Sequence, residues 1–320
     1  MPLRIAFLGT PAAAVPALEA FLAAADTEVA AVITNPDRPS GRGHKLTAPP
    51  VKVTALAGGV PVWQPEKPRD VLARLTALRV DACAVVAYGS ILPADVLAAG
   101  GAGFVNLHFS LLPAWRGAAP VPASILHGDR ETGVTCFRLD PGMDTGDVLA
   151  SRATRILPDE TAGELIERLA ETGAGVLVDA VRGLVDGSLP LIPQDHDAAT
   201  YAPKISPEDA AISWTDPAER IDRMVRAYNP MPGAHTTVEG QRLKLHRVTP
   251  SPGTSSSETA STAEAQGATA PGSVRIGEDG RPIVRCGEGA VRLDEVQPAG
   301  RPRMDGAAFA RGHELTVLGT

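Results

Sequence analysis

The chain has 320 residues, a hydrophobic fraction of 44% and a charged fraction of 21%, which is the composition of a soluble globular protein. One hydrophobic core rarely serves a chain of this length, so we expect about two domains. No apolar run is long enough to cross a bilayer, and residues 1–8 lack the basic region and cleavage site of a signal peptide. These features exclude a membrane protein and predict a cytoplasmic one. The net charge of −7 argues against nonspecific coating of nucleic acid but leaves a specific RNA partner open.

The cysteine and histidine patterns predict neither disulfides nor a metal site. Cys83, Cys136 and Cys286 are odd in number, far apart in the chain and placed in apolar segments, as is typical of buried reduced thiols. The chain contains no CxxC pair, no HExxH motif and no P-loop. We therefore expect no metal.

The first half of the chain alternates strands with helices. Residues 3–8 predict a strand that ends in a Gly-Thr-Pro turn, and an alanine-rich helix and a second strand over 28–33 follow. Apolar strands throughout indicate a mostly parallel sheet covered by helices on both faces, an α/β, Rossmann-like fold. No complete G-x-G-x-x-G follows a strand, so a dinucleotide is not expected. The remaining predicted helices cover residues 49–57, 68–78 and 93–98, and the remaining strands lie near Val62 and at 82–87 and 104–107.

Two more strands, over 133–139 and 148–156, enclose an acidic loop at 140–147. Thr161 and Glu164 form a capping box that predicts the start of one long amphipathic helix. Residues 190–207 have the proline-rich composition of a linker. We therefore expect a catalytic domain over residues 1–189, a linker over 190–206 with the boundary near Ile205, and a second domain over 207–320.

The second domain begins with a predicted capping box at Asp216 and Glu219 and a short helix. Several short strands follow, which suggests a small β-barrel or sandwich. Residues 249–272 are rich in Ser, Thr, Ala and Gly without apolar periodicity and predict a disordered surface loop. The predicted helix stripe is Ile221, Met224, Val225 and Tyr228, and the strands cover 234–238, 242–248, 273–276, 282–286 and 290–296.

Three polar side chains form the candidate catalytic set. Asn106 and His108 end an apolar strand two residues apart, so the pleat points both side chains to one side. Asn106 can donate an N–H to a developing oxyanion. Asp144 lies between Gly142 and Gly146 in the acidic loop, where its carboxylate can orient an imidazole and accept a proton. The spacing of the three aspartates does not match a calcium loop, and Asp140 and Asp147 are expected to cap turns.

Two basic features suggest ligand contacts. Arg116, beside Trp115, either packs at a helix entry or grips an anionic or planar group, and the sequence leaves both readings open. A long polar loop over 35–45 has no predicted structure, and such loops are often functional. Its basic residues suit contacts with a phosphate backbone, and they are Arg38, Arg42, His44 and Lys45.

At this point the motifs resemble those of the methionyl-tRNA formyltransferase family. The segment N-x-H-x-S-L-L-P-x-x-R-G-A-A-P from Asn106, followed by D-x-G-x-D-T-G-D from Asp140, carries the resemblance. It extends over nearly the whole chain, through F-L-G-T-P at Phe7, N-P-D-R-P-x-G-R-G at Asn35 and Y-A-x-K at Tyr201. The Asn-His-Asp set alone is shared by the wider folate-dependent formyltransferase group.

The resemblance implies a Rossmann-like catalytic domain that binds 10-formyltetrahydrofolate and an OB-like C-terminal β-barrel that helps to hold initiator methionyl-tRNA. It implies that the methionyl amine attacks the formyl carbon, that Asn106 and protonated His108 stabilise the oxyanion, and that Asp144 orients His108 and assists proton removal. The basic loop and Arg116 would contact the tRNA. The residues expected to line the folate pocket are Val86, Tyr88, Gly89, Ile91, Leu92, Ser110, Leu111, Leu112 and Pro113.

Other readings remain open from the residues. The same three residues could transfer a formyl group to an amino sugar or a glycinamide ribonucleotide, or hydrolyse formyltetrahydrofolate, and the fold could also serve a noncatalytic RNA-binding protein. The predicted barrel and basic loop favour a tRNA over a small amine. Nothing in the sequence demands more than a monomer.

Overall fold

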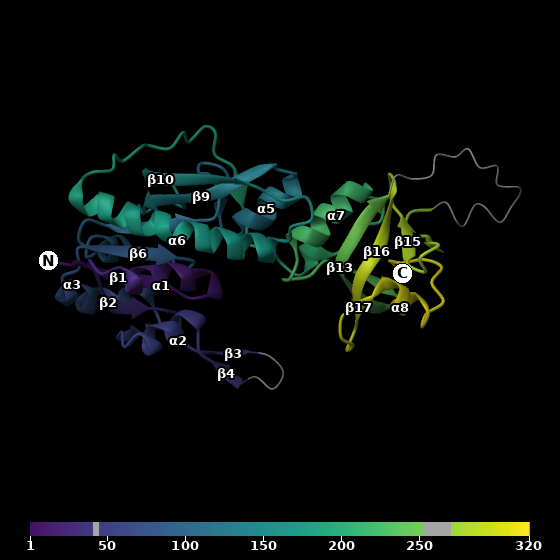
Figure 1. Ribbon diagram of the computed structural model, residues 1–320, viewed down its shortest axis with the longest axis horizontal. Helices are drawn as coiled ribbons and strands as arrows, with labels where there is room; N and C mark the ends of the chain where they lie inside the picture. The colour runs from purple at the N-terminus through teal and green to yellow at the C-terminus, as the bar shows by residue number, and fades with distance from the viewer. Residues whose placement is uncertain (41–44, 252–269, 320) are drawn as a thin grey trace, which may run out of the picture. The chain divides into compact units, whose positions relative to one another are not determined.

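The computed structural model describes residues 1–40, 45–251 and 270–319, and the chain divides into two compact units. The first unit comprises residues 1–120, 130–155 and 166–203, and the second comprises 121–129, 156–165 and 204–320. Each unit has its own sheet (Figure 1).

The first unit contains a seven-stranded sheet in the order β10-β9-β7-β6-β1-β2-β5. The ladders from β7 through β5 are parallel, and β9 pairs antiparallel with both β7 and β10. The prediction of a mostly parallel α/β sheet is thus confirmed. The strands are β1 (Leu3–Gly9), β2 (Thr27–Ile33), β5 (Val62–Trp63), β6 (Ala82–Val86), β7 (Phe104–His108), β9 (Glu131–Arg138) and β10 (Val148–Arg155).

Helices cover both faces of this sheet because its strands are apolar on both sides. Phe7 of β1 packs edge-on against Phe21 of α1, with ring centroids 6.4 Å apart, whereas Ala6 and Leu8 belong to the core on the other side with Leu75 of α3. The long helix α6 lies against β7. The helices are η1 (Ala12–Ala14), α1 (Val15–Ala23), α2 (Pro50–Ala57), η2 (Pro68–Val71), α3 (Leu72–Leu78), α4 (Ala94–Leu97) and α6 (Ala162–Asp186).

The capping box at the start of α6 is formed as predicted. Glu164 accepts hydrogen bonds from the backbone N–H and the hydroxyl of Thr161, and the Glu164 N–H donates to the Thr161 hydroxyl in return. The box satisfies donors that the first helical turn leaves without partners.

Two short ladders complete the first unit, and both correct the sequence analysis. The loop over 35–45 was expected to lack structure, but β3 (Arg38–Ser40) and β4 (Lys45–Thr47) pair antiparallel. A helix entry was one of the two readings left open for the segment from Arg116, but β8 (Arg116–Gly117) pairs in parallel with β11 (Tyr201–Ala202). Helix α5 (Pro120–His127) begins only at Pro120.

The second unit contains a six-stranded antiparallel sheet in the order β12-β13-β16-β15-β14, with β17 paired to β16. The sheet is curled into an open half-barrel around one apolar core, as expected of an OB-like domain (Figure 1). Its elements are η3 (Glu208–Ala210), α7 (Ala218–Ala227), β12 (His235–Val238), β13 (Gln241–Ser251), β14 (Val274–Ile276), β15 (Pro282–Arg285), β16 (Ala290–Pro298), β17 (Met304–Asp305) and α8 (Gly306–Ala310).

Helix α7 presents the predicted stripe to this core, since Ile221, Met224, Val225 and Tyr228 are all buried. The capping box predicted at its start is wrong. The helix begins one residue after Pro217, and the Asp216 carboxylate instead accepts a hydrogen bond from the Arg220 side chain one turn along.

Two further differences concern the second unit. Strand β13 continues to Ser251, so residues 249–251 belong to the sheet and not to the predicted loop, most of which lies outside the described residues. The sequence analysis missed β17 and α8, although Asp305 caps α8 by accepting from the Ala307 and Ala308 N–H groups. None of the helices in the described ranges is both long and apolar enough to cross a membrane.

Candidate active site

Asn106 and His108 leave the carboxyl end of β7 on the same side of the sheet. Leu107, between them, points toward α6, where a side chain at Gly173 would collide with it. By the alternation of a strand, Asn106 and His108 point the opposite way. The carboxamide of Asn106 is half-buried and makes no hydrogen bond with any residue in the part of the chain that the structure describes.

The imidazole of His108 is only 6% exposed, and its surroundings fix its tautomer. Its Nε2 lies 2.9 Å from the carbonyl oxygen of Trp115, which can only accept, so Nε2 carries the hydrogen. The ring packs edge-on against Phe137 with centroids 6.4 Å apart. Nδ1 therefore remains for chemistry, and it lies 3.8 Å from Oδ2 of Asp144.

Burial is the largest influence on His108 and lowers the pKa of its imidazole below the usual 6.5. The negative charge of Asp144 and the hydrogen bond to Trp115 raise the pKa but do not offset burial. Because the net shift is downward, His108 is neutral at pH 7. In the resting protein its Nδ1 lone pair faces the carboxylate and can take up a proton.

The loop 140–147 brings Asp144 to His108. Asp144 has a left-handed backbone with φ of +54°, and its Oδ2 accepts the backbone N–H of Gly117 at 2.7 Å. Asp140 shapes the turn by accepting the Gly142 N–H and the Thr145 hydroxyl, which confirms the capping role predicted for it. Strand β7 and this loop thus bring Asp144 to His108, and Asn106 points to the same side of the sheet as His108.

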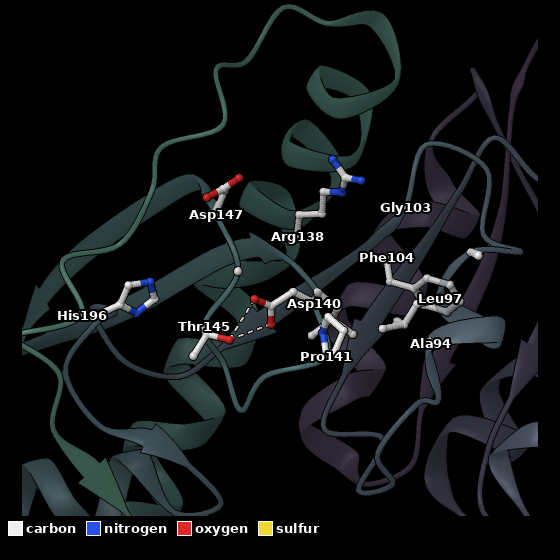
Figure 2. A pocket seen from close by; sticks show the side chains of 13 residues that line it. Ala94, Leu97, Gly103, Phe104, Arg138, Asp140, Pro141, Thr145, Asp147 and His196 are labelled. Carbon is white, nitrogen blue, oxygen red and sulfur yellow. Dashed lines mark hydrogen bonds between the residues drawn. The ribbon is translucent and has the colours of Figure 1, made fainter.

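A cavity of about 470 Å³ lies on another side of the same loop. Figure 2 shows its apolar wall from Leu97, Phe104 and Pro141, and a polar side with Asp140, Thr145 and Asp147. Asp147 was expected to cap a turn, but its side chain lines this cavity. The other lining residues are Ala94, Ala98, Gly103, Arg138, Leu139, Gly146 and His196.

The residues predicted to bind folate precede this cavity in the chain and are not among those that line it. Val86, Tyr88 and Leu92 are buried, whereas Ile91 is 90% exposed. Ser110 is buried, and its hydroxyl donates to the carbonyl of Ala114, which leaves the hydroxyl oxygen as an acceptor. Gly89 has a φ of +81°, Leu112 donates its N–H to Thr135, and Leu111 and Pro113 are half-buried.

Arg116 differs most from its predicted role. We expected it to contact tRNA, but it is 2% exposed and its guanidinium is turned inward. It donates to Oε1 of Gln194 from Nε and Nη2, at 3.1 and 2.7 Å, and from Nη2 to Nδ1 of His196 at 3.1 Å. In this structure the guanidinium of Arg116 therefore offers tRNA almost no exposed surface. The sequence analysis missed Gln194, because a single glutamine in a proline-rich segment carries no recognisable signal.

Hydrogen bonds from Lys52 hold the residues at the base of the basic hairpin β3–β4. Lys52 of α2 donates to both carboxylate oxygens of Asp37, at 2.8 and 2.9 Å, and to Oε1 of Gln64. These bonds hold the pKa of the Asp37 carboxyl below its usual range. Arg38 and Lys45 are exposed at the hairpin, and Arg42 and His44 lie outside the described residues. Among the described residues, no group of three His, Cys, Asp or Glu side chains is placed to hold a metal ion.

Comparisons with known families agree with this architecture. The model of the formyl transferase family matches residues 3–181, and that of the formyl transferase C-terminal domain matches residues 204–314. A methionyl-tRNA formyltransferase of Frankia alni is 45% identical over 98% of this chain and 92% of its own length. One from a Nocardioides species is 46% identical over 98% and 96%.

Solved structures share the fold at low sequence identity. A methionyl-tRNA formyltransferase from Clostridium thermocellum has a TM-score of 0.57 at 18% identity, over 77% of this chain and 93% of its own. An N-formyltransferase from Helicobacter canadensis, in complex with folinic acid and dTDP-3-aminofucose, has a TM-score of 0.66 at 18% identity, over 93% of this chain and 100% of its own. These likenesses support the two-part fold.

Proposed function

The chain belongs to the formyl transferase family, and we propose that it transfers the formyl group of 10-formyltetrahydrofolate to the free amino group of methionyl-tRNA, giving N-formylmethionyl-tRNA for translation initiation. The observation that carries the proposal is that Asp144 lies beside His108, with Asn106 on the same side of the sheet. An unpaired amide donor, an imidazole with a free Nδ1 and a carboxylate 3.8 Å from it are the groups that acyl transfer to an amine needs.

The proton of the attacking amine has a defined place to go. Neutral His108 accepts it at Nδ1, since Nε2 already holds a hydrogen bonded to the Trp115 carbonyl. The imidazolium that results lies beside the carboxylate of Asp144, which stabilises the new charge. The new Nδ1–H of His108 and the Asn106 amide then both donate toward the oxyanion of the tetrahedral intermediate. When the intermediate collapses, the bond between the formyl carbon and N10 of the folate breaks, and the proton held by His108 passes to N10, so that tetrahydrofolate leaves and His108 is neutral again. This refines the sequence prediction, because His108 becomes charged only during the reaction.

We propose that the cavity of Figure 2 takes a part of the folate co-substrate away from the reacting formyl group, because none of Asn106, His108 and Asp144 lines it. Its wall of Leu97, Phe104, Leu139 and Pro141 suits a flat ring, and Asp140 and Asp147 offer acceptors to ring N–H groups. The co-substrate supplies the formyl carbon as the electrophile. The loop 140–147 lines this cavity and also carries Asp144, so one loop would join folate binding to the proton-transfer residue.

The acceptor is methionyl-tRNA and not a small amine. The full-length relatives at 45% identity are methionyl-tRNA formyltransferases, and the likeness to the sugar enzyme, at 18%, extends to fold alone. Exposed Arg38 and Lys45 on the hairpin, with Arg42 and His44 between them, give phosphate-binding groups at the catalytic unit. We keep the domain limits of 1–189 and 207–320, with residues 190–203 packed on the first domain, and propose that the active form is a cytoplasmic monomer.

The deciding assay incubates the protein with 10-formyltetrahydrofolate and either initiator or elongator methionyl-tRNA and follows formyl transfer. We expect turnover with the initiator. Turnover of an amino sugar or a ribonucleotide amine without turnover of methionyl-tRNA would refute the proposal, and release of formate without an amine would point to hydrolysis.

Site variants test the residue roles in the same assay. Asn106→Ala should reduce turnover by at least about a hundredfold, as the loss of an oxyanion donor does in other acyl-transfer enzymes. Replacing Arg42 and Lys45 by Ala should raise the KM for tRNA and leave the KM for folate unchanged. An effect confined to folate would contradict the role given to the hairpin.

A further inference from the structure

A chain of buried hydrogen bonds runs from Arg116 through Gln194 to the backbone of the loop that carries Asp144. Gln194 is 8% exposed, and its Nε2 donates to the carbonyl oxygens of Asp144 at 2.9 Å and Gly146 at 2.7 Å. Its Oε1 accepts both donors of Arg116. The two ends of the Gln194 carboxamide therefore bind different partners: Oε1 binds Arg116, and Nε2 binds the loop 140–147.

The charge of Arg116 strengthens this chain. Among the described residues, the side-chain partners of its guanidinium are an amide and an imidazole, and none is a carboxylate. Two charged donors on Oε1 polarise the amide of Gln194, so its N–H groups become stronger donors to the two loop carbonyls. A buried positive charge without an acidic partner is costly, and functional sites are where such costs are commonly found.

The loop needs external support at this point. Asp144 is held in a left-handed conformation, which costs about 1 kcal/mol or more for a residue other than glycine and persists only where the surroundings enforce it. At Gly146 a side chain would collide with the carbonyl of Arg138, so the backbone there is closely packed. The two bonds from Gln194 fix the carbonyl groups on both sides of Thr145.

The segment that carries Gln194 is itself attached to the catalytic unit. The Ile192 and Val148 backbones exchange two hydrogen bonds at 2.8 and 2.9 Å. Thr200 accepts the Trp115 N–H at its hydroxyl and the Arg116 N–H at its carbonyl. The residues expected to form a linker are thus hydrogen-bonded to the catalytic unit, at Val148 and at residues 115–116.

We infer that Gln194, polarised by Arg116, is a positioning residue for the transfer reaction: it holds the Asp144 carboxylate against His108 and touches no substrate. The inference rests on the formyl-transfer function proposed above. It predicts that changes at Gln194 reduce kcat through Asp144 and leave both KM values nearly unchanged.

Gln194→Glu separates the two ends of the carboxamide. The carboxylate keeps an acceptor for Arg116, so the fold retains that contact, but it has no N–H for the Asp144 and Gly146 carbonyls. We expect kcat to fall by about tenfold or more, as when a catalytic group is misplaced, with KM values changed by less than about twofold. Gln194→Met keeps the volume of the side chain but removes both the acceptor and the donor, and kcat should fall to a similar extent.

A double-mutant cycle distinguishes a positioning role of Gln194 from a merely structural one. In an Asp144→Asn background the change Gln194→Glu should reduce single-turnover rates by less than about threefold, because the carboxylate it positions is already absent. Equal losses in both backgrounds, or no loss in the wild-type background, would overturn the inference. Val181→Ala, a buried truncation in α6 away from the site, is the matched control: it should lower Tm without lowering kcat.

A measurement without turnover separates this inference from the proposed function. Titration of His108 by NMR in the wild-type protein and in Gln194→Met, which adds no charge of its own, reports the distance to the Asp144 charge. We expect a lower pKa of His108 in the variant, because Asp144 raises that pKa. An unchanged titration would refute the positioning role, whereas absence of wild-type formyl transfer would refute the proposed function alone.

Discussion

Replacing Asp144 by Asn tests how much the carboxylate charge contributes. The variant keeps the size of the side chain and an oxygen that can accept the Gly117 N–H, which is bound at 2.7 Å in the wild type. It removes the negative charge 3.8 Å from Nδ1 of His108. The loop geometry is thus preserved while the electrostatic partner of the imidazolium is lost.

The distance sets the magnitude. Unit charges 3.8 Å apart attract by about 4 kcal/mol at an effective dielectric constant of about 20, and by about 2 kcal/mol if water doubles that value. Both side chains are largely buried, with 7% and 18% exposed, so this range applies. Because each 1.4 kcal/mol is a factor of about ten, we expect the rate of formyl transfer to fall between about thirtyfold and about a thousandfold.

The pH dependence has a definite sign. Burial already holds the pKa of His108 below 6.5, and Asp144 is the main group that opposes the shift. Without its charge the pKa falls further, so at every pH the imidazolium formed on proton transfer is less stable. The rate that requires His108 to take the amine proton should therefore decrease at every pH where wild-type His108 is neutral.

Single-turnover formyl transfer with excess enzyme, followed from about pH 6 to about pH 9, measures both effects. Asp179→Asn is a matched control, since it removes one negative charge from a side chain that is 77% exposed on α6. A rate for Asp144→Asn within about threefold of the wild type would refute the role given to the carboxylate.

Three further predictions follow from other contacts. Gly117→Ala should lower kcat by about tenfold or more, because φ is +116° and the added Cβ would lie 2.7 Å from the Ala202 carbonyl, displacing the N–H that binds the catalytic carboxylate. Lys52→Met should raise the KM for tRNA by about threefold or more by releasing Asp37 at the base of the hairpin, with the KM for folate as its control. His246 has a lowered pKa through burial, so the unfolded chain binds its proton first and the free energy of unfolding falls as the pH drops below about 6.5. In His246→Gln, urea unfolding at about pH 8 and about pH 5.5 should differ less than in the wild type.

The sequence predicted what depends on local pattern. Apolar runs placed β7 and β9 correctly, and the two-residue period put Asn106 and His108 on one side of the sheet. Two glycines identified the tight loop around Asp144. These features follow from side-chain periodicity and backbone freedom within a few residues, so they can be read before any tertiary contact is known.

The sequence could not predict contacts between distant segments. Gln194 lies 50 residues from Asp144 and 78 from Arg116, and neither spacing has a local signature. Composition suggested a linker where the structure has a segment hydrogen-bonded to the catalytic unit, because proline-rich segments can also run along a folded surface. For the same reason Arg116 could not be known to point inward until its partners on that segment were in place.

The role of His108 illustrates why backbone partners decide the chemistry. A histidine two residues after an asparagine is compatible with a proton donor or a proton acceptor, and the sequence leaves the resting charge of His108 open. The carbonyl of Trp115, a residue with φ of +60°, fixes the hydrogen on Nε2, while burial keeps the ring neutral. Only Nδ1 is then available, and it faces Asp144. Under the proposed function the proton therefore arrives from the substrate amine, so His108 acts first as a base and only afterwards as a charged partner of the oxyanion.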